Sequence, residues 1–347
     1  MMNNPTRCDI FCVVVDNYGD AGVCWRLAKQ LADEHGWRVR LWIDDMAALQ
    51  QLAPDHTAGP VEVRLWQDPW LTTDCADVVI EAFACTLPPA YIEAMAIRAR
   101  PPVWLNLEYL SAESWVAGCH GLSSPDPRLP LVKHFFFPGF AAGTGGLLRE
   151  RNYDERCKAF DEPAFRARFG LPPKSKDELT ISLFSYPNPA LPELMRVWAA
   201  SNRPVRLLQP GSSEATSTTG NLTVHPLPFL PQPRYDELLW ACDLNFVRGE
   251  DSFVRAQWAA KPFVWHIYPQ AEDAHRDKLD AFLAIHPAGA QLKAFWQAWN
   301  GQGTPDWPRF AARLPALGAP MEEWARTLAA RPDLASKLVQ FCIERLK

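Results

Sequence analysis

Two aspartates four residues apart, Asp16 and Asp20, are spaced so that both carboxylates could reach one pocket. They bracket a short turn that follows the apolar run 10–15 and precedes a helical pattern over 21–35. In an open α/β sheet this place is the carboxyl end of the first strand, where ligands bind. Two carboxylates would repel a phosphate, so they indicate a cationic ligand or a proton to be removed. The structural alternative is that Asp20 caps the helix and Asp16 forms an Asx-turn.

A second group of charged and hydroxyl side chains follows the apolar stretch 244–247. It contains Arg248, Glu250, Asp251 and Ser252, and a helical pattern begins there. A helix N-terminus supplemented by an arginine and a hydroxyl group suits a diphosphate. Glu250 and Asp251 fit a phosphate poorly unless they face sugar hydroxyls or a cationic acceptor. Helix capping by Asp251 or Ser252 is the alternative for those two residues.

Several aromatic residues and one glutamine could complete a nucleotide site. Phe184 and Tyr186 lie at the end of an apolar run, and Phe229 and Gln232 lie in a loop before a helical pattern. A nucleotide base needs a stacking face and amide hydrogen bonds, which such residues supply. Tyr268, at the end of another apolar run, could bring a hydroxyl to the phosphates. Ordinary core packing is the alternative for each aromatic residue.

These side chains must be positioned by two series of strands that alternate with helical patterns. The predicted strands are 10–15, 39–43, 61–65, 78–81 and 103–107 in the first half of the chain, and 179–185, 205–208, 222–225, 244–247 and 263–267 in the second. Such alternation predicts doubly wound, mostly parallel sheets, and two similar units facing each other across a cleft would form the GT-B arrangement. Periplasmic-binding-like proteins and some epimerases share this outline, so architecture alone does not choose a function. The predicted division is an N-terminal domain over 1–150, a linker over 151–177, a second domain over 178–318, and helices over 319–347 that could pack back on the first domain.

Composition and missing motifs exclude several classes of protein. The net charge of −5 argues against nucleic-acid binding, and no run approaches the roughly 18 apolar residues of a membrane span. Nine scattered cysteines without a Cys-x-x-Cys pair predict reduced thiols in a cytoplasmic protein. The sequence has no Asp-x-Asp, no Gly-x-Gly-x-x-Gly after the first strand, and no His-Glu-x-x-His. We therefore expect neither a metal nor a nicotinamide cofactor.

At the motifs 12–26, 181–186 and 245–257 the chain resembles the bacterial protein-arginine rhamnosyltransferases that modify translation elongation factor P. The resemblance extends over nearly the whole chain. It implies a GT-B fold of two Rossmann-like domains. It also implies transfer of rhamnose from dTDP-β-L-rhamnose to an arginine nitrogen of elongation factor P, with inversion at the anomeric carbon. The modified factor would then rescue ribosomes stalled at polyproline.

The resemblance also implies roles for individual residues. Asp20 matches the general base, Asp16 a second essential carboxylate, and Glu250 the third catalytic acid. The matching donor contacts are Asp251, Ser252, Arg248 and Tyr268 near the diphosphate, Phe184, Tyr186, Phe229 and Gln232 near the thymidine, and Asn17 and Gly19 in the first turn. Carboxylates suit an arginine acceptor because they can hold a guanidinium and take its proton.

Two other functions stay open on the residues alone. One is a non-catalytic nucleotide-sugar-binding protein that docks on a translation factor. The other is a sugar-nucleotide epimerase, which would carry a bound nicotinamide. The enzyme hypothesis predicts the protein acceptor and the nucleotide sugar as its partners, with no membrane and no direct nucleic-acid contact.

Overall fold

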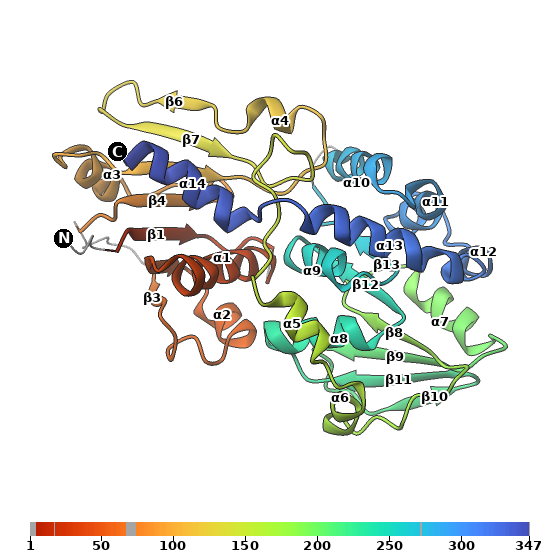
Figure 1. Ribbon diagram of the computed structural model, residues 1–347. Coiled ribbons are helices and arrows are strands. Elements are labelled where there is room, and N and C mark those ends of the chain that lie inside the picture. The colour runs from red at the N-terminus through yellow and green to blue at the C-terminus, as the bar shows by residue number, and fades with distance from the viewer. Residues whose placement is uncertain (1–4, 17, 67–73, 271–272, 347) are drawn as a thin grey trace. The chain divides into compact units, whose positions relative to one another are not determined.

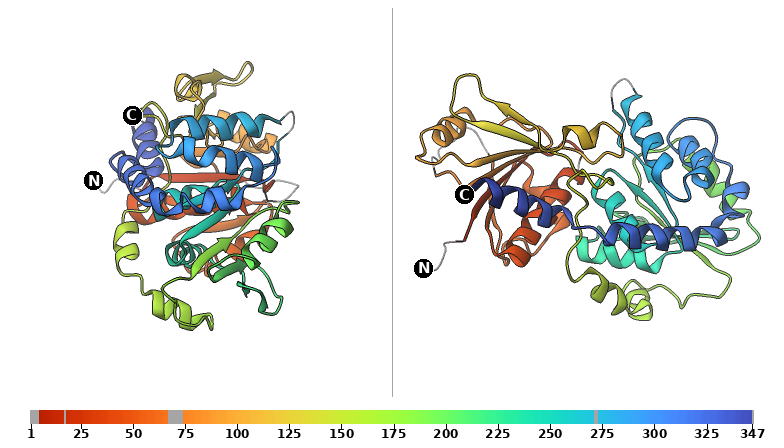
Figure 2. Two further views of the ribbon diagram at one scale, coloured as in Figure 1. Left: turned by 90° about the vertical axis from the view of Figure 1, so that its right-hand side faces the viewer. Right: turned by 45° about the horizontal axis from the view of Figure 1, so that its top comes forward.

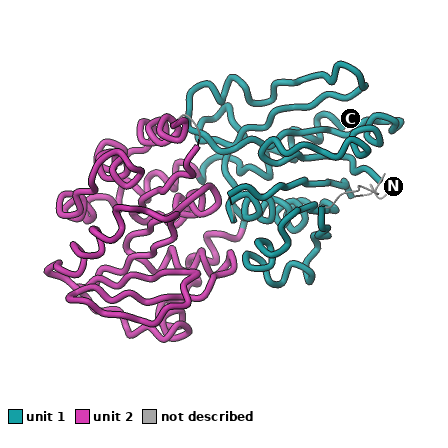
Figure 3. Tube along the Cα trace, turned by 180° about the vertical axis from the view of Figure 1, so that it is seen from behind, with its two compact units in different colours: residues 1–151, 329–347 teal, residues 152–328 magenta. Residues whose placement is uncertain are grey.

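The computed structural model describes residues 5–16, 18–66, 74–270 and 273–346 (Figure 1). The chain divides into two compact units, coloured separately in Figure 3. Unit 1 contains Met1–Arg151 and Ala329–Lys347, and unit 2 contains Asn152–Leu328. The segment 152–177, which the sequence analysis treats as a linker, therefore belongs to unit 2. The last two helices are divided between the units, because the chain returns to unit 1 only at its end.

Unit 1 is built on a seven-stranded sheet in the order β3-β2-β1-β4-β5-β7-β6. All neighbouring strands are parallel except β6, which runs antiparallel to β7. The strands are β1 (Arg7–Cys12), β2 (Arg38–Ile43), β3 (Glu62–Leu65), β4 (Val78–Ala82), β5 (Val103–Leu107), β6 (Ser123–Pro125) and β7 (Val132–Phe136). The apolar-run criterion does not find β6 and β7, because β6 is exposed and polar and β7 carries Lys133 and His134.

The first strand begins and ends earlier than its apolar run predicts. β1 ends at Cys12, in register with Ile43, so residues 13–15 lie beyond it. The N–H of Val14 donates to Asp44 Oδ1 at 2.9 Å, and the N–H of Val15 donates to Asp20 Oδ2 at 2.8 Å. The apolar residues after β1 thus donate to carboxylates instead of continuing the sheet.

Helices cover the unit 1 sheet, namely α1 (Gly19–His35), α2 (Met46–Leu52), α3 (Pro89–Ala96), α4 (Val116–Cys119) and α14 (Leu334–Leu346). α1 and α14 contact each other and lie side by side in Figure 1. Gln30 of α1 ties the returning chain to this unit, since its Nε2 donates to Asp333 Oδ1 at 2.9 Å. α3 packs into an aromatic core that includes Phe11, Trp42 and Trp104.

Unit 2 has a six-stranded sheet in the order β10-β11-β9-β8-β12-β13, parallel except for β10. Its strands are β8 (Leu179–Leu183), β9 (Val205–Pro210), β10 (Ser217–Thr219), β11 (Leu222–Leu227), β12 (Leu244–Arg248) and β13 (Phe263–His266). Every strand predicted for the second half of the chain is present. β10 is short, polar and exposed, which is why an apolar pattern does not reveal it.

The helices of unit 2 are α5 (Tyr153–Lys158), α6 (Glu162–Arg168), α7 (Leu191–Ala199), α8 (Gln232–Ala241), α9 (Asp251–Ala259), α10 (Ala274–Ile285), α11 (Gly289–Trp299), α12 (Trp307–Ala311) and α13 (Leu314–Ala329). α10 and α11 are in contact and run beside each other in both views of Figure 2. The Trp324 Nε1 of α13 donates to Gln257 Oε1 of α9 at 2.7 Å. That bond fixes α13 against the helix that begins at the second acidic motif.

Candidate active site

The turn after β1 brings the two predicted aspartates together. Asp20 Oδ2 accepts the backbone N–H groups of Val15 at 2.8 Å and Asp16 at 2.9 Å. The N–H of Gly19 donates to the Asp16 carbonyl at 2.6 Å and closes the turn. Both carboxylates are buried, with residue exposures of 7% for Asp16 and 2% for Asp20. The predicted acidic pair is therefore a compact feature at the carboxyl edge of the unit 1 sheet.

The capping role predicted as an alternative for Asp20 is wrong. α1 begins at Gly19 with Tyr18 as its N-cap, and Asp20 lies within the first helical turn. A capping side chain accepts N–H groups further along its own helix. Asp20 instead accepts N–H groups that precede the helix, so it holds the turn to the helix.

Gly19 has a steric reason to be a glycine. A Cβ atom at this position would lie 2.5 Å from Asp16 Oδ2, closer than real Cβ atoms approach an oxygen. The missing side chain leaves space for the Asp16 carboxylate. Its assignment as a donor contact stays a prediction, and Asn17, predicted beside it, lies outside the described residues.

Burial dominates the electrostatics of Asp20. It raises the pKa of Asp20 above that of an ordinary aspartate, and Asp44 raises it further. Hydrogen bonds from the N–H groups of Asp16 and Val15 and from the Tyr109 side chain act in the opposite direction. The net effect is a raised pKa, so the carboxylate is a stronger base than one in water.

Tyr109 and the ring that packs on it lie outside the motifs predicted from the sequence. Tyr109 lies two residues beyond β5, and Phe83 lies directly beyond β4. Their rings are stacked, with centroids 4.4 Å apart and planes at 16°. Position at the carboxyl end of a strand is the same signal that identifies Asp16. It would have found both residues if applied to every strand.

In unit 2 the predicted phosphate motif forms a tightly fixed turn between β12 and α9. Gly249 has a positive φ of 59°, which favours glycine. The Gly249 N–H donates to the His266 carbonyl at 3.2 Å, and the Gly249 carbonyl accepts Trp265 Nε1 at 2.8 Å. The Ser252 hydroxyl accepts the Arg248 N–H at 3.0 Å and donates to the Arg248 carbonyl.

Neither Asp251 nor Ser252 caps α9, so that alternative is wrong as well. Glu250 occupies the N-cap position, and its side chain makes no capping hydrogen bond. The Ser252 hydroxyl bonds to Arg248 instead of the helix. A helix start that no side chain caps keeps its first N–H groups directed outward, as an anion site requires.

Arg248 lies between two of the predicted aromatic residues. Its guanidinium carbon is 4.3 Å from the ring centre of Phe184 and 4.8 Å from that of Tyr186. Tyr186 also makes an edge contact with Tyr268, at 5.6 Å between centroids. The rings predicted to meet a base thus contact the arginine. They hold a cation at the carboxyl edge of β12.

A hydrogen bond joins the start of α8 to the start of α9. Gln232 is buried, and its Nε2 donates to Asp251 Oδ2 at 3.2 Å. Phe229 lies half-buried in the loop before α8. Deeper in the unit, Arg255 Nε and Nη2 bond to the two oxygens of Asp236 at 2.8 and 2.7 Å. This buried ion pair locks α8 to α9 beneath the predicted donor residues.

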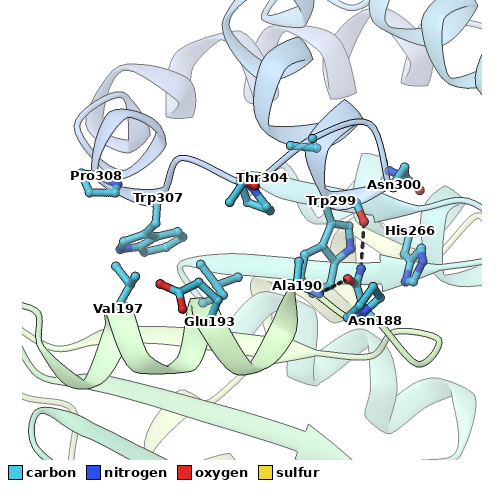
Figure 4. Close-up of a pocket in the computed structure, with 16 residues that line it drawn as sticks. Asn188, Ala190, Glu193, Val197, His266, Trp299, Asn300, Thr304, Trp307 and Pro308 are labelled. Carbon is cyan, nitrogen blue, oxygen red and sulfur yellow. Dashed lines mark hydrogen bonds between the residues drawn. The ribbon is translucent and has the colours of Figure 1, made fainter.

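Unit 2 also contains a hollow of about 590 Å³ between α7 and the segment 299–308 (Figure 4). Asn188 shapes one end, where it accepts the Ala190 N–H at 2.9 Å and donates to the Trp299 carbonyl at 2.8 Å. His266 also lines the hollow, and burial lowers the pKa of this histidine to about 4, which keeps it neutral. None of the predicted donor residues lines the hollow, so it is a separate feature.

Three further observations concern metals, membranes and thiols. Within the described ranges, no group of three or more His, Cys, Asp or Glu side chains is arranged to hold a metal ion. Of the helices in the described part of the chain, none is long and apolar enough to cross a membrane. All nine cysteines are free.

Comparison with known proteins identifies close relatives. A family model described as "Elongation-Factor P (EF-P) rhamnosyltransferase EarP" matches residues 8–343. The protein-arginine rhamnosyltransferase of Pseudomonas putida is 49% identical, over 96% of this chain and 97% of the relative. That of Pseudomonas aeruginosa is 47% identical, over 96% and 98%.

Solved structures agree with these relatives. One, described as concerning EarP-mediated arginine glycosylation of translation elongation factor EF-P, has a TM-score of 0.68 and 35% identity, and the match covers 98% of this chain and 99% of that one. The glycosyltransferase CalG4 has a TM-score of 0.55 at 14% identity, with 99% of each chain covered. MurG of Acinetobacter baumannii has 0.52 at 12%, covering 99% and 100%. The last two show the fold alone, and the predicted GT-B fold class is confirmed.

Proposed function

The chain belongs to the EarP family of protein-arginine rhamnosyltransferases, and we propose that it transfers rhamnose from dTDP-β-L-rhamnose to one arginine of translation elongation factor P. The observation that carries this proposal is the buried Asp20 carboxylate with its raised pKa at the carboxyl edge of the unit 1 sheet. The family description and the solved relative both name the elongation factor, which supports it as the acceptor.

The acceptor chemistry calls for carboxylates. A guanidinium has a pKa above about 12 and no available lone pair, so it is a poor nucleophile until it loses a proton. We assign proton removal to Asp20 because burial strengthens it as a base. Asp16 and Glu250 would hold the remaining N–H groups of the acceptor by charge-assisted hydrogen bonds.

The donor chemistry calls for positive charge at the leaving group. Breaking the bond from the anomeric carbon to the diphosphate oxygen leaves the extra negative charge on dTDP. The N-terminus of α9, the Arg248 guanidinium and the Tyr268 hydroxyl would stabilise this charge without a metal ion. Gln232 and Phe229 would contact the thymidine, and the Gln232–Asp251 hydrogen bond supports a shared position for these residues.

The proposed reaction is a single displacement. The arginine nitrogen attacks the anomeric carbon as the carbon–oxygen bond to dTDP breaks, and the nitrogen loses its proton to Asp20. One attack from the opposite face converts the β-linked donor into an α-linked product, with one base and no covalent enzyme intermediate. The products are rhamnosylated arginine, dTDP and a proton. We place the reaction in the cytoplasm, where it would activate the factor for polyproline-stalled ribosomes.

Mass spectrometry of the acceptor tests the proposal. Incubation of elongation factor P with the enzyme and dTDP-β-L-rhamnose should add one deoxyhexose, and fragmentation should locate it on an arginine. A factor whose acceptor arginine is replaced by lysine is the matched control and should stay unmodified. Donor binding without any mass gain would refute the enzymatic proposal and favour a nucleotide-sugar-binding protein. The anomeric proton signal of the product distinguishes inversion from retention.

A further inference from the structure

We propose that Tyr109 is a positioning residue for the Asp20 carboxylate, and that Phe83 holds the Tyr109 ring in the orientation this requires. The inference rests on the proposed function, in which Asp20 accepts the proton of the arginine. Neither aromatic residue belongs to the two acidic motifs. Both lie at the carboxyl edge of the sheet that carries Asp20, beyond β4 and β5.

The carboxylate of Asp20 already accepts several hydrogen bonds within the protein. A carboxylate offers about four lone-pair positions. Two N–H groups, from Val15 and Asp16, donate to Oδ2, and the Tyr109 side chain supplies a third hydrogen bond. About one position is then left for a guanidinium N–H. The three donors fix the plane of the carboxylate and determine which lone pair faces the acceptor.

The ring of Phe83 packs on the ring of Tyr109. Phe83 and Tyr109 are stacked at 4.4 Å, and each is half-buried. Such a parallel contact restricts rotation of the phenol, and therefore the direction in which its hydroxyl donates. Without this contact, the Tyr109 ring would have to be oriented anew each time its hydroxyl bonds to Asp20.

The backbone that carries Phe83 is held in an unfavourable conformation. Phe83 and Ala84 both have positive φ angles, 58° and 56°, which are unfavourable for residues with a Cβ. The conformation is held by the Phe83 N–H bonding to the Leu107 carbonyl at 2.7 Å, and by the Ala84 N–H bonding to Asn106 Oδ1 at 3.1 Å. Both partners lie on β5, the strand that leads to Tyr109. The strained turn thus couples the Phe83 ring to the strand that presents Tyr109.

The groups around Asp20 shift its pKa in opposite directions. Burial and the Asp44 carboxylate oppose its ionised form, and the Tyr109 hydrogen bond favours it, as do the two backbone N–H groups. The Asp16 carboxylate belongs to the same turn, and the neighbouring Cys24 of α1 is a buried thiol whose pKa is raised, so it stays neutral. Tyr109 is therefore the side chain that offsets burial. Its loss should make Asp20 harder to ionise.

The test is the pH profile of kcat/KM for Tyr109→Phe, which keeps the ring and removes the hydroxyl. We expect the acid limb to move to higher pH, with transfer on the acid side of the profile reduced about tenfold and restored at higher pH. The midpoint of a pH profile does not depend on the amount of active protein, so partial misfolding cannot mimic this shift. An acid limb at the wild-type position would overturn the proposal.

Two further variants separate positioning from general damage. Phe83→Leu should lower transfer, and the double variant Phe83→Leu/Tyr109→Phe should be no slower than Tyr109→Phe alone, because Phe83 acts through Tyr109. Additive losses would contradict the role of Phe83. Tyr91→Phe is the matched control, since it removes a tyrosine–aspartate bond, to Asp9, in the same unit and should leave the midpoint in place.

The outcome for Tyr109 can be distinguished from the outcome for the proposed function. A wild-type enzyme that transfers no sugar refutes the function. A wild-type enzyme that transfers sugar, loses activity in Asp20→Asn, and keeps its acid limb in Tyr109→Phe refutes only the positioning role.

Discussion

The carboxylate of Asp20 accepts the backbone N–H of Asp16 at 2.9 Å, so the two candidate acids form one structural unit. The bond favours the ionised form of Asp20, and it also fixes the backbone position from which the Asp16 side chain extends. Removing the charge of Asp20 and displacing Asp16 should therefore have different consequences, which separate substitutions can resolve.

Replacing Asp20 by asparagine should abolish transfer and preserve the turn. The asparagine oxygen can still accept the N–H groups of Val15 and Asp16, but the amide cannot take a proton. We expect the single-turnover rate to fall at least a hundredfold, the scale of a lost general base. Calorimetry should give a nearly unchanged affinity for dTDP-β-L-rhamnose, because the predicted donor residues other than Asn17 and Gly19 belong to unit 2. Loss of donor binding in this variant would contradict the base assignment.

The wild-type enzyme should lose activity at a higher pH than an ordinary aspartate would allow. Burial raises the pKa of Asp20, and a base acts only when deprotonated, so kcat/KM should fall as the pH drops through that raised value. The acid limb should lie above about pH 4, where an unperturbed aspartate titrates. Stopped assays in a constant-ionic-strength buffer series would measure it. A limb at or below that pH would show that Asp20 is not the titrating base.

Replacing Gly19 by alanine should displace Asp16 and slow transfer. The new Cβ would lie 2.5 Å from Asp16 Oδ2, so the carboxylate must move. A displacement of about 1 Å in a catalytic group can cost about a hundredfold in rate, and we expect a loss of that order. Because Gly19 is also a predicted donor contact, the rates are compared at saturating dTDP-β-L-rhamnose. Gly118→Ala is the matched control in unit 1, because no atom lies within 4 Å of its added Cβ. Equal rates in the two variants would argue against a role for Asp16.

Replacing Arg248 by lysine should weaken donor binding even though the charge is kept. The planar guanidinium lies between Phe184 and Tyr186, and an ammonium group cannot fill that space in the same way. We expect KM for the donor to rise about tenfold, with a smaller change in kcat. Arg196→Lys, on the exposed face of α7, should leave both constants unchanged. An unchanged donor KM in Arg248→Lys would remove Arg248 from the diphosphate site.

Local sequence patterns were sufficient to predict both acidic motifs. Asp16 and Asp20 lie in one strand–turn–helix segment, as do Arg248 and Ser252, so a single stretch of chain places each pair. The same locality explains why almost all strands of the two sheets were predicted. Strands β6 and β10 were missed because they are exposed and polar, and β7 was missed because Lys133 and His134 interrupt its apolar pattern.

The contacts that tune these motifs come from segments far apart in the sequence. Tyr109 contacts Asp20 because β1, β4 and β5 are neighbours in the sheet, and no local sequence pattern predicts that strand order. The helix-capping alternatives failed for a related reason. Aspartate and serine are common N-cap residues, but the side chains of Asp20 and Ser252 each bond to the backbone that precedes their helix. This bonding can be seen only in the folded turn.

Replacing Arg255 by methionine should destabilise unit 2 and also weaken donor binding. Arg255 and Asp236 are both fully buried as side chains, and removing the arginine takes away the two hydrogen bonds that it donates to the Asp236 carboxylate. Loss of one partner of a buried pair costs about 3–5 kcal/mol, which a lower midpoint in urea unfolding would report. Since the pair locks α8 to α9, donor KM should rise as well. Arg326→Met, whose bridge to Glu323 is exposed, should change stability by no more than about 0.5 kcal/mol. If both variants unfold at the same urea concentration, the buried pair is not what holds these helices together.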